Sequence, residues 1–387
     1  MSADATPAPV PRRPRRTGGR RILIVAGAVL CVLLILFAVV WLNRRAATRQ
    51  ILIGWLEQRG VDADMDIERL EMDGLVARIR IGDPANPDVL IERVEVDYGI
   101  GAPWSKGGLG VTPTRIRLVR PVVRASVRGG KLTFGSLDPL IEEFTGRPPR
   151  PDSRSPLVIV ERARVRLDTD YGPANILGDA RVDNGKLMRL VARMPATAFK
   201  SGEAEARGLS AAVDLTTTGD RIAVRFDATA EHATMEGLAG DTARLVVTGN
   251  LPYPDLKGRR GDGRAAINAA FTAARLSSGG TTARGTDARL GFTGQTTGWI
   301  ETFRIAGDGD LDVRAARVDG PGTAASGIRL RLDHADTAFS RDAKGFGWRL
   351  QGPATVMAAR ATGAGLEGTG VTLRSAGFTL GGRNAAL

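Results

Sequence analysis

Alternation of apolar and charged residues along the chain after Gly60 is the pattern that most constrains the fold. Val94 and Val96, for example, alternate with Glu95 and Asp97. Because residues two apart in a β-strand share a face, this pattern predicts strands with one apolar face and one solvated face. The same alternation recurs at residues 115–118, 123–128, 164–168, 222–228, 245–247, 328–332 and 371–373. The sequence therefore predicts a mainly β fold, with a large antiparallel or mixed sheet.

Few segments suggest helices, and the 49 glycines are dispersed among short polar stretches, as turns between many strands require. Residues 136–145 form one expected helix, which Ser136 or Asp138 would cap. A second, short amphipathic helix is expected over residues 51–56, where apolar side chains recur at helical spacing before Gly60. This helix either packs on the sheet or lies on a membrane surface, and packing is the simpler interpretation.

An uncharged apolar run occupies residues 22–42, with the sequence ILIVAGAVLCVLLILFAVVWL. As a helix rising about 1.5 Å per residue, it is long enough to cross the ~30 Å hydrocarbon core of a bilayer. A cleaved signal peptide would have a shorter apolar region and a small-residue cleavage site, whereas this run is followed by Asn43 and arginines. We therefore predict a transmembrane anchor from Ile22 to Leu42, with Trp41 at the interface.

Arginines flank this apolar run unevenly. They are Arg12, Arg13, Arg15, Arg16, Arg20 and Arg21 on its N-terminal side and Arg44, Arg45 and Arg49 on its C-terminal side. By the positive-inside rule, this bias places the N-terminus in the cytoplasm and sends the remaining chain across the membrane. Residues 1–21, rich in Pro and Arg, are expected to form a disordered basic cytoplasmic tail.

The formal net charge of +12 does not by itself indicate nucleic-acid binding. Residues 1–49 contain nine arginines and one acidic residue, so most of the excess positive charge belongs to the predicted tail and its flanks. No aromatic residues are interleaved with the arginines of residues 12–21, so the pattern lacks a stacking platform for single strands. The basic tail is better explained as a topology signal, and nucleic acid is not an expected partner.

Sequence motifs for catalysis or metal binding are absent. The single cysteine, Cys31, lies in the apolar run, which excludes disulfides and cysteine chemistry from the rest of the chain. His232 and His334 are far apart, in surroundings rich in glycine and alanine. The Asp-rich stretch 308–312 resembles a polysaccharide-cleaving cluster, but alternate acids are ordinary on the solvated face of a strand. We therefore expect no enzymatic activity, no cofactor and no metal site.

The proline-rich segment GRPPRPDSRSP, residues 146–156, is the clearest candidate for a linker. Proline lacks the N–H that a sheet ladder needs, so this composition favours an irregular connection. We therefore predict a membrane-proximal helix and a first β segment over residues 43–145, and an elongated β-sheet segment over residues 157–387.

Aromatic residues make up only 5% of the chain. The predicted inward positions are mostly Val, Leu, Ile and Ala, whereas a closed globular core of this size usually contains more aromatic side chains. Two interpretations stay open: the apolar faces pack in a thin sheet-on-sheet interior, or they line an open groove for an aliphatic ligand. Alternation alone favours the first, because every sheet needs an apolar inward face.

Residues 55–98, directly behind the predicted anchor, read WLEQRGVDADMDIERLEMDGLVARIRIGDPANPDVLIERVEVDY. Together with KLTFGSLDPLI at 131–141 and VERARVRLDTDYGPANILGDARVDNGKL at 160–187, this segment resembles the YdbH-type branch of the AsmA-like proteins. These relatives of TamB are envelope proteins of Gram-negative bacteria. The resemblance covers about residues 20–190, and it rests on architecture and not on catalytic residues.

This resemblance implies a long, twisted, taco-shaped β-sheet that projects from the inner membrane into the periplasm. Its apolar lining would carry phospholipid toward the outer membrane, with an outer-membrane lipoprotein or another envelope protein as a partner. A non-transporting β scaffold that binds other envelope proteins is the alternative. The candidate lining residues are Val94, Val96, Ile116, Leu118, Val165, Leu167, Val224 and Phe226.

The expected length is short for such a conduit. About 18 strands at a spacing of ~4.8 Å give a groove only ~90 Å long. A truncated C-terminus, a short paralogue, and one piece that a partner completes are three explanations that the sequence leaves open.

Overall fold

The computed structural model describes most of the chain after residue 45. The described residues are 46, 48–54, 56–100, 111–129, 131–139, 155–202, 204–235, 237–255, 259–299, 302–342 and 345–384. The predicted tail, residues 1–21, and the predicted anchor from Ile22 to Leu42, with Trp41, lie outside them. Within these ranges, no helix has both the length and the apolarity that crossing a membrane requires.

β-Strands dominate the described residues, which confirms the mainly β prediction. From β8 onward each strand has between 15 and 20 residues. The strands are β1 Ala63–Leu70, β2 Gly74–Ile81, β3 Val89–Ile100, β4 Val111–Arg128, β5 Lys131–Thr133, β6 Leu157–Thr169, β7 Gly172–Asp183, β8 Lys186–Ser201, β9 Ala204–Thr218, β10 Arg221–Met235, β11 Leu238–Pro252, β12 Gly263–Ser278, β13 Thr281–Trp299, β14 Thr302–Gly320, β15 Thr323–Asp342, β16 Gly345–Gly363 and β17 Leu366–Asn384.

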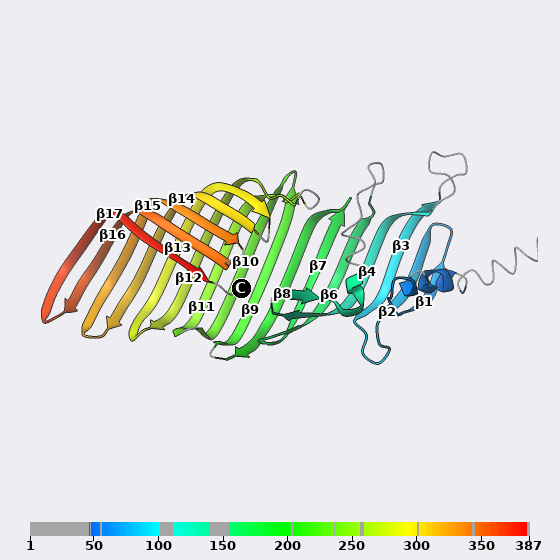
Figure 1. Ribbon diagram of the computed structural model, residues 1–387, viewed down its shortest axis with the longest axis horizontal. Coiled ribbons are helices and arrows are strands. Elements are labelled where there is room, and N and C mark those ends of the chain that lie inside the picture. Colours follow the sequence, from blue (N-terminus) through cyan, green and yellow to red (C-terminus); the bar gives the residue numbers. More distant parts are fainter. Residues whose placement is uncertain are drawn as a thin grey trace, which may run out of the picture.

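These strands form one long sheet in which chain neighbours lie side by side, from the blue β1 to the red β17 (Figure 1). The pairings are antiparallel except that between β4 and β6, which run parallel with Arg115 opposite Leu157 and Val127 opposite Thr169. The short β5 pairs with the end of β4. Among the described residues β1 pairs only with β2, and β17 only with β16, so the sheet is curled but not closed.

The predicted linker, residues 146–156, lies mostly outside the described residues, which resume at Ser155. The strands on its two sides pair directly, since β4 and β6 share a parallel ladder. The two predicted segments, 43–145 and 157–387, are therefore parts of one continuous sheet.

A short helix precedes β1, and the described residues between 48 and 57 are helical. Its Leu52 packs on a small buried cluster of β1 and β2, and its Leu56 packs on an adjacent, larger cluster that extends to β3. The chain leaves the helix through Gly60, whose φ of 73° suits a helix C-terminus. The structure thus confirms the amphipathic helix expected over residues 51–56 and its packing on the sheet.

The other expected helix, residues 136–145, is described only as far as residue 139. Its first turn is the 3₁₀ helix η1, Gly135–Leu137. The prediction that Ser136 caps it is wrong, because the Ser136 hydroxyl and N–H both donate to Asp88 Oδ2, at 2.7 and 3.0 Å. Asp138 Oδ1 does accept a backbone N–H at 2.8 Å, from the residue four positions earlier.

A line of bends crosses the sheet, marked by residues with positive φ inside strands. Where ladders cross it between β11 and β14, one rung is missing while the register on its two sides is unchanged. Each strand of such a pair therefore has one extra residue at the bend, and the pairing register is the same on both sides of it. This line runs from β9 to β17, and its positive-φ residues are Gly208 of β9, Thr242 of β11, Gly285 of β13, Gly327 of β15 and Gly370 of β17. A separate bend nearer the start of the sheet has a positive φ at Arg120 of β4 and Arg162 of β6.

One side of the sheet is closely packed near both ends. The first buried cluster, from the start of the sheet, contains Val61, Ala63, Ile81, Val89, Ile91 and Val94. A second cluster in β15 and β16 is centred on Leu332 and Leu350. Beside it, the Phe339 ring lies edge-on to Phe292 at 6.2 Å and stacks on Phe346 at 6.4 Å. Each fully buried large apolar side chain contributes roughly 1.5–3 kcal/mol to the fold.

Candidate functional site

The face of the sheet that carries these buried clusters is called the inner face below, and the opposite, charged face is called the outer face. The first four candidate lining residues share the inner face. Val94 lies opposite Leu118 and Val96 lies opposite Ile116 across the β3–β4 ladder. Directly opposed residues in a ladder point to the same side of a sheet. Beyond the bend at Arg162, the same face continues along β6.

Two further candidates lie on that continuation. Val165 and Leu167 of β6 lie opposite Val123 and Ala125 of β4 in the parallel ladder. The side chain of Ala125 is buried, and those of Val165 and Leu167 are half-buried. The charged neighbours of these two residues on β6 are exposed, which is the alternation that the sequence predicts.

The last two candidates lie further along the sheet on the same face. Val160 of β6 connects through β7 to Leu190 of β8, which lies opposite Leu215 of β9. Leu215 in turn lies opposite Val224 of β10, and Phe226 follows two residues later. The structure therefore brings all eight sequence-predicted lining residues onto one face.

The candidates differ in how exposed they are. Val94 is only 5% exposed and belongs to the first buried cluster, against which Val96, Ile116 and Leu118 pack. Leu56 of the N-terminal helix packs on the same cluster, so this part of the inner face is a closed core. The remaining candidates are half-buried, and they are Val165, Leu167, Val224 and Phe226.

The middle of the inner face holds an apolar pocket of about 570 Å³, formed by β8 to β12 and the turn after β6. This volume lies within the range of small-molecule sites. Its largest apolar side chains are Phe199, Leu209, Met235, Leu238, Phe271 and Leu276. Tyr171, Met235 and Leu238 are 54, 53 and 49% exposed. Apolar side chains that are clustered and this exposed are typical of a binding surface.

Sequence reasoning missed this pocket because it assumed uninterrupted alternation. At a bend, inner-face neighbours are three residues apart and not two, as are Ala206 and Leu209 in β9 and Ala273 and Leu276 in β12. The extra residue in β9 is accommodated at Gly208, which has a φ of 62°. A search for alternating apolar residues that allowed one inserted residue in each long strand would have found the residues that line the pocket.

Ion pairs cover much of the outer face. Arg117 donates two hydrogen bonds to Glu161, at 2.9 and 2.8 Å, and one to Glu95 at 3.2 Å. The hydrogen bonds from Arg117 lower the pKa of Glu161. Further along, hydrogen bonds from Arg329 lower the pKa of Asp312 to about 2. Such two-pronged guanidinium–carboxylate pairs fix adjacent strands to each other.

Both histidines also pair with aspartates. His232 Nδ1 lies 2.6 Å from Asp241 Oδ1, and His334 Nδ1 lies 3.1 Å from Asp308 Oδ2. The hydrogen bond with Asp308 raises the pKa of His334. The Asp-rich stretch of β14 is therefore engaged in outer-face pairing. In the ranges that the structure covers, no group of three or more His, Cys, Asp or Glu residues is placed to hold a metal ion.

The chemistry that the apolar pocket supports follows from its lining. It offers an apolar surface with few polar groups, which suits a hydrocarbon group and disfavours a polar metabolite. No family model, curated protein or solved structure matches this chain. The functional inference therefore depends on the geometry of the sheet and its two faces.

Proposed function

We propose that this chain is an inner-membrane-anchored periplasmic protein that shields phospholipid acyl chains during transport between the inner and outer membranes. The predicted anchor at residues 22–42 holds one end at the inner membrane, and the curled sheet extends into the periplasm. The observation that supports this proposal most directly is the apolar pocket, which lies on the inner face between two closely packed clusters. The similarity of residues 20–190 to AsmA-like proteins points to the same function.

The physical need for such a face is clear from the cost of exposing lipid. Each CH₂ group of an acyl chain costs about 0.8 kcal/mol to transfer into water, so a two-chain lipid rarely crosses an aqueous space unaided. A continuous apolar face keeps the chains dry, while the headgroup stays in solvent along the open edge of the sheet. Because contacts with hydrocarbon are not directional, no single lining residue is expected to be essential.

A non-transporting scaffold that binds other envelope proteins is the second candidate. The closed parts of the inner face favour it, since Val94 is 5% exposed and Leu332 is fully buried. If the pocket were also closed in the cell, partners would meet only the outer face and the sheet edges. The two candidates therefore differ in whether lipid reaches the inner face.

Photo-crosslinking in cells that contain labelled phospholipid distinguishes them. A photoreactive phenylalanine analogue at Phe226 or at Leu238 lies on the inner face, whereas one at Arg225 lies on the outer face of the same strand as Phe226. We expect lipid adducts at positions 226 and 238 and none at 225. Arg225 is the matched control, because it differs from Phe226 only in the side of the sheet that it faces.

Two outcomes would count against the conduit. If a folded, exported protein gives no adduct at either inner position, the scaffold is favoured. If adducts form equally at positions 225 and 226, the lipid contacts reflect general proximity to a membrane and not an occupied inner face.

A further inference from the structure

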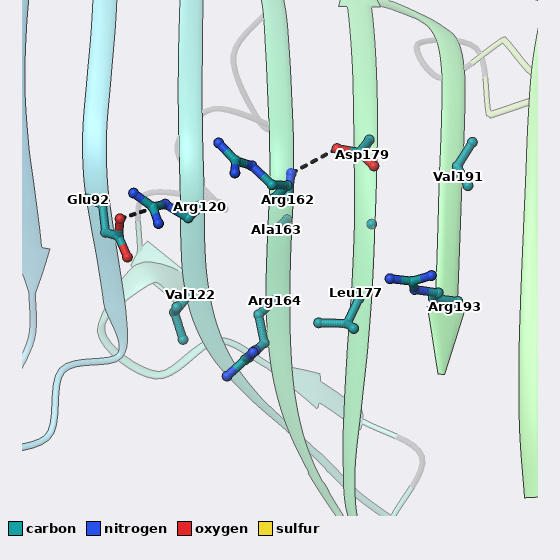
Figure 2. A pocket seen from close by; sticks show the side chains of 11 residues that line it. Glu92, Arg120, Val122, Arg162, Ala163, Arg164, Leu177, Asp179, Val191 and Arg193 are labelled. Atoms are coloured by element: carbon teal, nitrogen blue, oxygen red, sulfur yellow. Dashed lines mark hydrogen bonds and ion pairs between the residues drawn. The ribbon is translucent and has the colours of Figure 1, made fainter. Parts of the chain in front are cut away.

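We propose that an arginine cluster on the outer face of β6 and β8 binds a phosphoryl group, either as free phosphate or as the headgroup of a lipid. Arg162, Arg164 and Arg193 line a hollow of about 480 Å³ together with Val122 and Leu177 (Figure 2). This hollow lies on the opposite side of the sheet from the apolar pocket. The proposal is independent of the lipid conduit, and either can fail without the other.

Strand register brings two of these arginines to one place. Arg164 of β6 lies opposite Leu177 of β7, and Leu177 lies opposite Arg193 of β8. With ~4.8 Å between strands, the Cα atoms of the two arginines are ~10 Å apart. Figure 2 shows Arg193 extending toward Leu177, while Arg162 and Arg164 extend from β6 toward β4. Arg193 therefore already faces an anion above Leu177, and Arg164, an exposed side chain on the adjacent strand, would turn from β4 toward β7 to meet the same anion.

Among the residues that the structure describes, none of the three guanidiniums forms a close ion pair with a carboxylate, and Arg162 only contributes to lowering the pKa of the adjacent Glu161. Of the two acidic residues in the lining, Glu92 pairs with Arg120 through Oε2 and Nε at 2.7 Å, and Asp179 Oδ1 accepts the backbone N–H of Arg162 at 2.8 Å, so four arginines in the lining face two carboxylates. Elsewhere on the outer face arginines meet acids directly, as Arg244 meets Asp227 at 2.6 Å. The cluster thus has a local excess of positive charge.

A pair of directly opposed arginines lies near the hollow. Arg181 of β7 is directly opposite Arg189 of β8 in the same ladder, and both lie on the outer face. Like charges directly opposite each other destabilise a sheet. An anion bound between these strands would offset that repulsion. A ligand that supplies negative charge would thus stabilise this part of the sheet, although directly opposed arginines also occur in other strands, as at Arg284 and Arg317.

The shape of the cluster favours a phosphoryl group. Guanidinium groups present N–H donors in a planar fork that matches phosphate oxygens, and they remain charged at every physiological pH. A phosphoryl group offers three acceptor oxygens to the three arginines, whereas a carboxylate offers only two. The apolar side chains of Val122, Leu177 and Val191 border the site, so they would shield part of a bound phosphoryl group from water.

Calorimetric titration of the full chain in a neutral detergent tests this site. The probes are inorganic phosphate and a soluble, short-chain phosphatidic acid. The test variant is R164Q/R193Q, and the matched control is R264Q/R304Q, which removes the same charge from two exposed outer-face arginines of β12 and β14. We expect the test variant to weaken binding of both probes at least ~10-fold, and the control to change it less than ~2-fold.

The two probes also identify the source of the phosphoryl group. A phosphatidic acid affinity at least ~10-fold above that of phosphate indicates a lipid headgroup, and equal affinities indicate free phosphate. The proposal is overturned if neither probe binds the unmodified chain, or if both variants weaken binding equally. Circular dichroism spectra of the variants confirm that any loss of binding is not a loss of fold.

Discussion

Asp312 shows how a single side chain ties two strands together on the outer face. Its carboxylate accepts hydrogen bonds from Arg329 of the neighbouring strand at 3.0 and 2.6 Å, and from Arg314 of its own strand at 3.4 and 3.1 Å. Hydrogen bonds from Arg329 lower its pKa to about 2. A carboxyl with a lowered pKa stabilises the fold above its unfolded pKa of about 3.9, and this contribution is lost as the pH falls through the folded pKa.

Asp312→Asn should therefore lower the free energy of unfolding by about 1 kcal/mol at pH 7, as expected for a partly exposed ion pair. The difference from the unmodified chain should shrink between about pH 4 and pH 2 and vanish below pH 2, where the carboxyl is protonated in both states. Urea unfolding followed by circular dichroism at several pH values measures it. Asp66→Asn, which changes an exposed carboxyl of β1, is the control, and an equal loss there would rule out the ion pair as the cause.

Two glycines of one strand separate the cost of a bend from the cost of an added side chain. Gly370 of β17 has a φ of 61°, whereas Gly377 of the same strand has no positive φ. A Cβ at either position meets no atom within 4 Å. Alanine at the two positions thus differs only in backbone strain, because a left-handed conformation is unfavourable for any residue with a Cβ.

Gly370→Ala should lower the free energy of unfolding by roughly 1–2 kcal/mol. Gly377→Ala should leave it unchanged or raise it by up to about 1 kcal/mol, because alanine restricts the unfolded chain. Thermal unfolding of both variants in parallel makes the comparison. Equal effects of the two substitutions would show that the bend at Gly370 does not depend on a positive φ.

Most elements could be predicted from the sequence because alternation is a local property. The pattern even contained the bend of β4, since Ile116 and Leu118 follow one phase and Val123 and Ala125 the other. The position of this bend could not be predicted from the sequence. It falls at Arg120, which has a φ of 51°, and arginine has no preference for that conformation. The parallel pairing of β4 with β6 was also hidden, since it joins strands across a proline-rich connection.

For the candidate site, the sequence was enough to identify the correct face of the sheet. It was not enough to tell which residues on that face are covered by other side chains and which are open. All eight candidates point to the inner face, because register follows from alternation. Whether a residue there is closed or open depends on what covers it. Val94 is closed because the cluster under Leu56 forms around it, and the pocket near Leu238 is open because nothing in the described residues covers it. Such coverage is a property of the assembled sheet.

At the scale of the whole molecule, the proposed conduit requires an unbroken apolar path along the inner face. Phe226 and Val247 lie opposite each other on this face in the β10–β11 ladder, and Arg225 and Thr248 occupy the adjacent outer-face rung. Leu373 of β17, on the inner face and 65% exposed, lies well beyond them along the sheet. Charge placed at the first pair would interrupt the path to Leu373.

The double variant Phe226→Asp/Val247→Asp should therefore reduce lipid adducts at a photoreactive Leu373 position at least ~10-fold, because two carboxylates in an apolar path are costly to desolvate. The outer variant Arg225→Asp/Thr248→Asp should leave those adducts unchanged. Labelled phospholipid in cells provides the readout. Undiminished adducts in the inner variant would mean that lipid does not pass through the middle of the sheet, and equal losses in both would point to destabilised protein.

Nearly all contacts join strands that are neighbours in the sheet, so the pattern of contacts is one-dimensional, as in repeat proteins. In such architectures stability is close to a sum of local terms, and folding can start at any hairpin and spread from it like a zipper. Each added hairpin lengthens the sheet by about 10 Å and leaves every other contact in place. Evolution can therefore fit a chain of this kind to gaps of different widths by duplicating or deleting hairpins, with no redesign of the strands that remain.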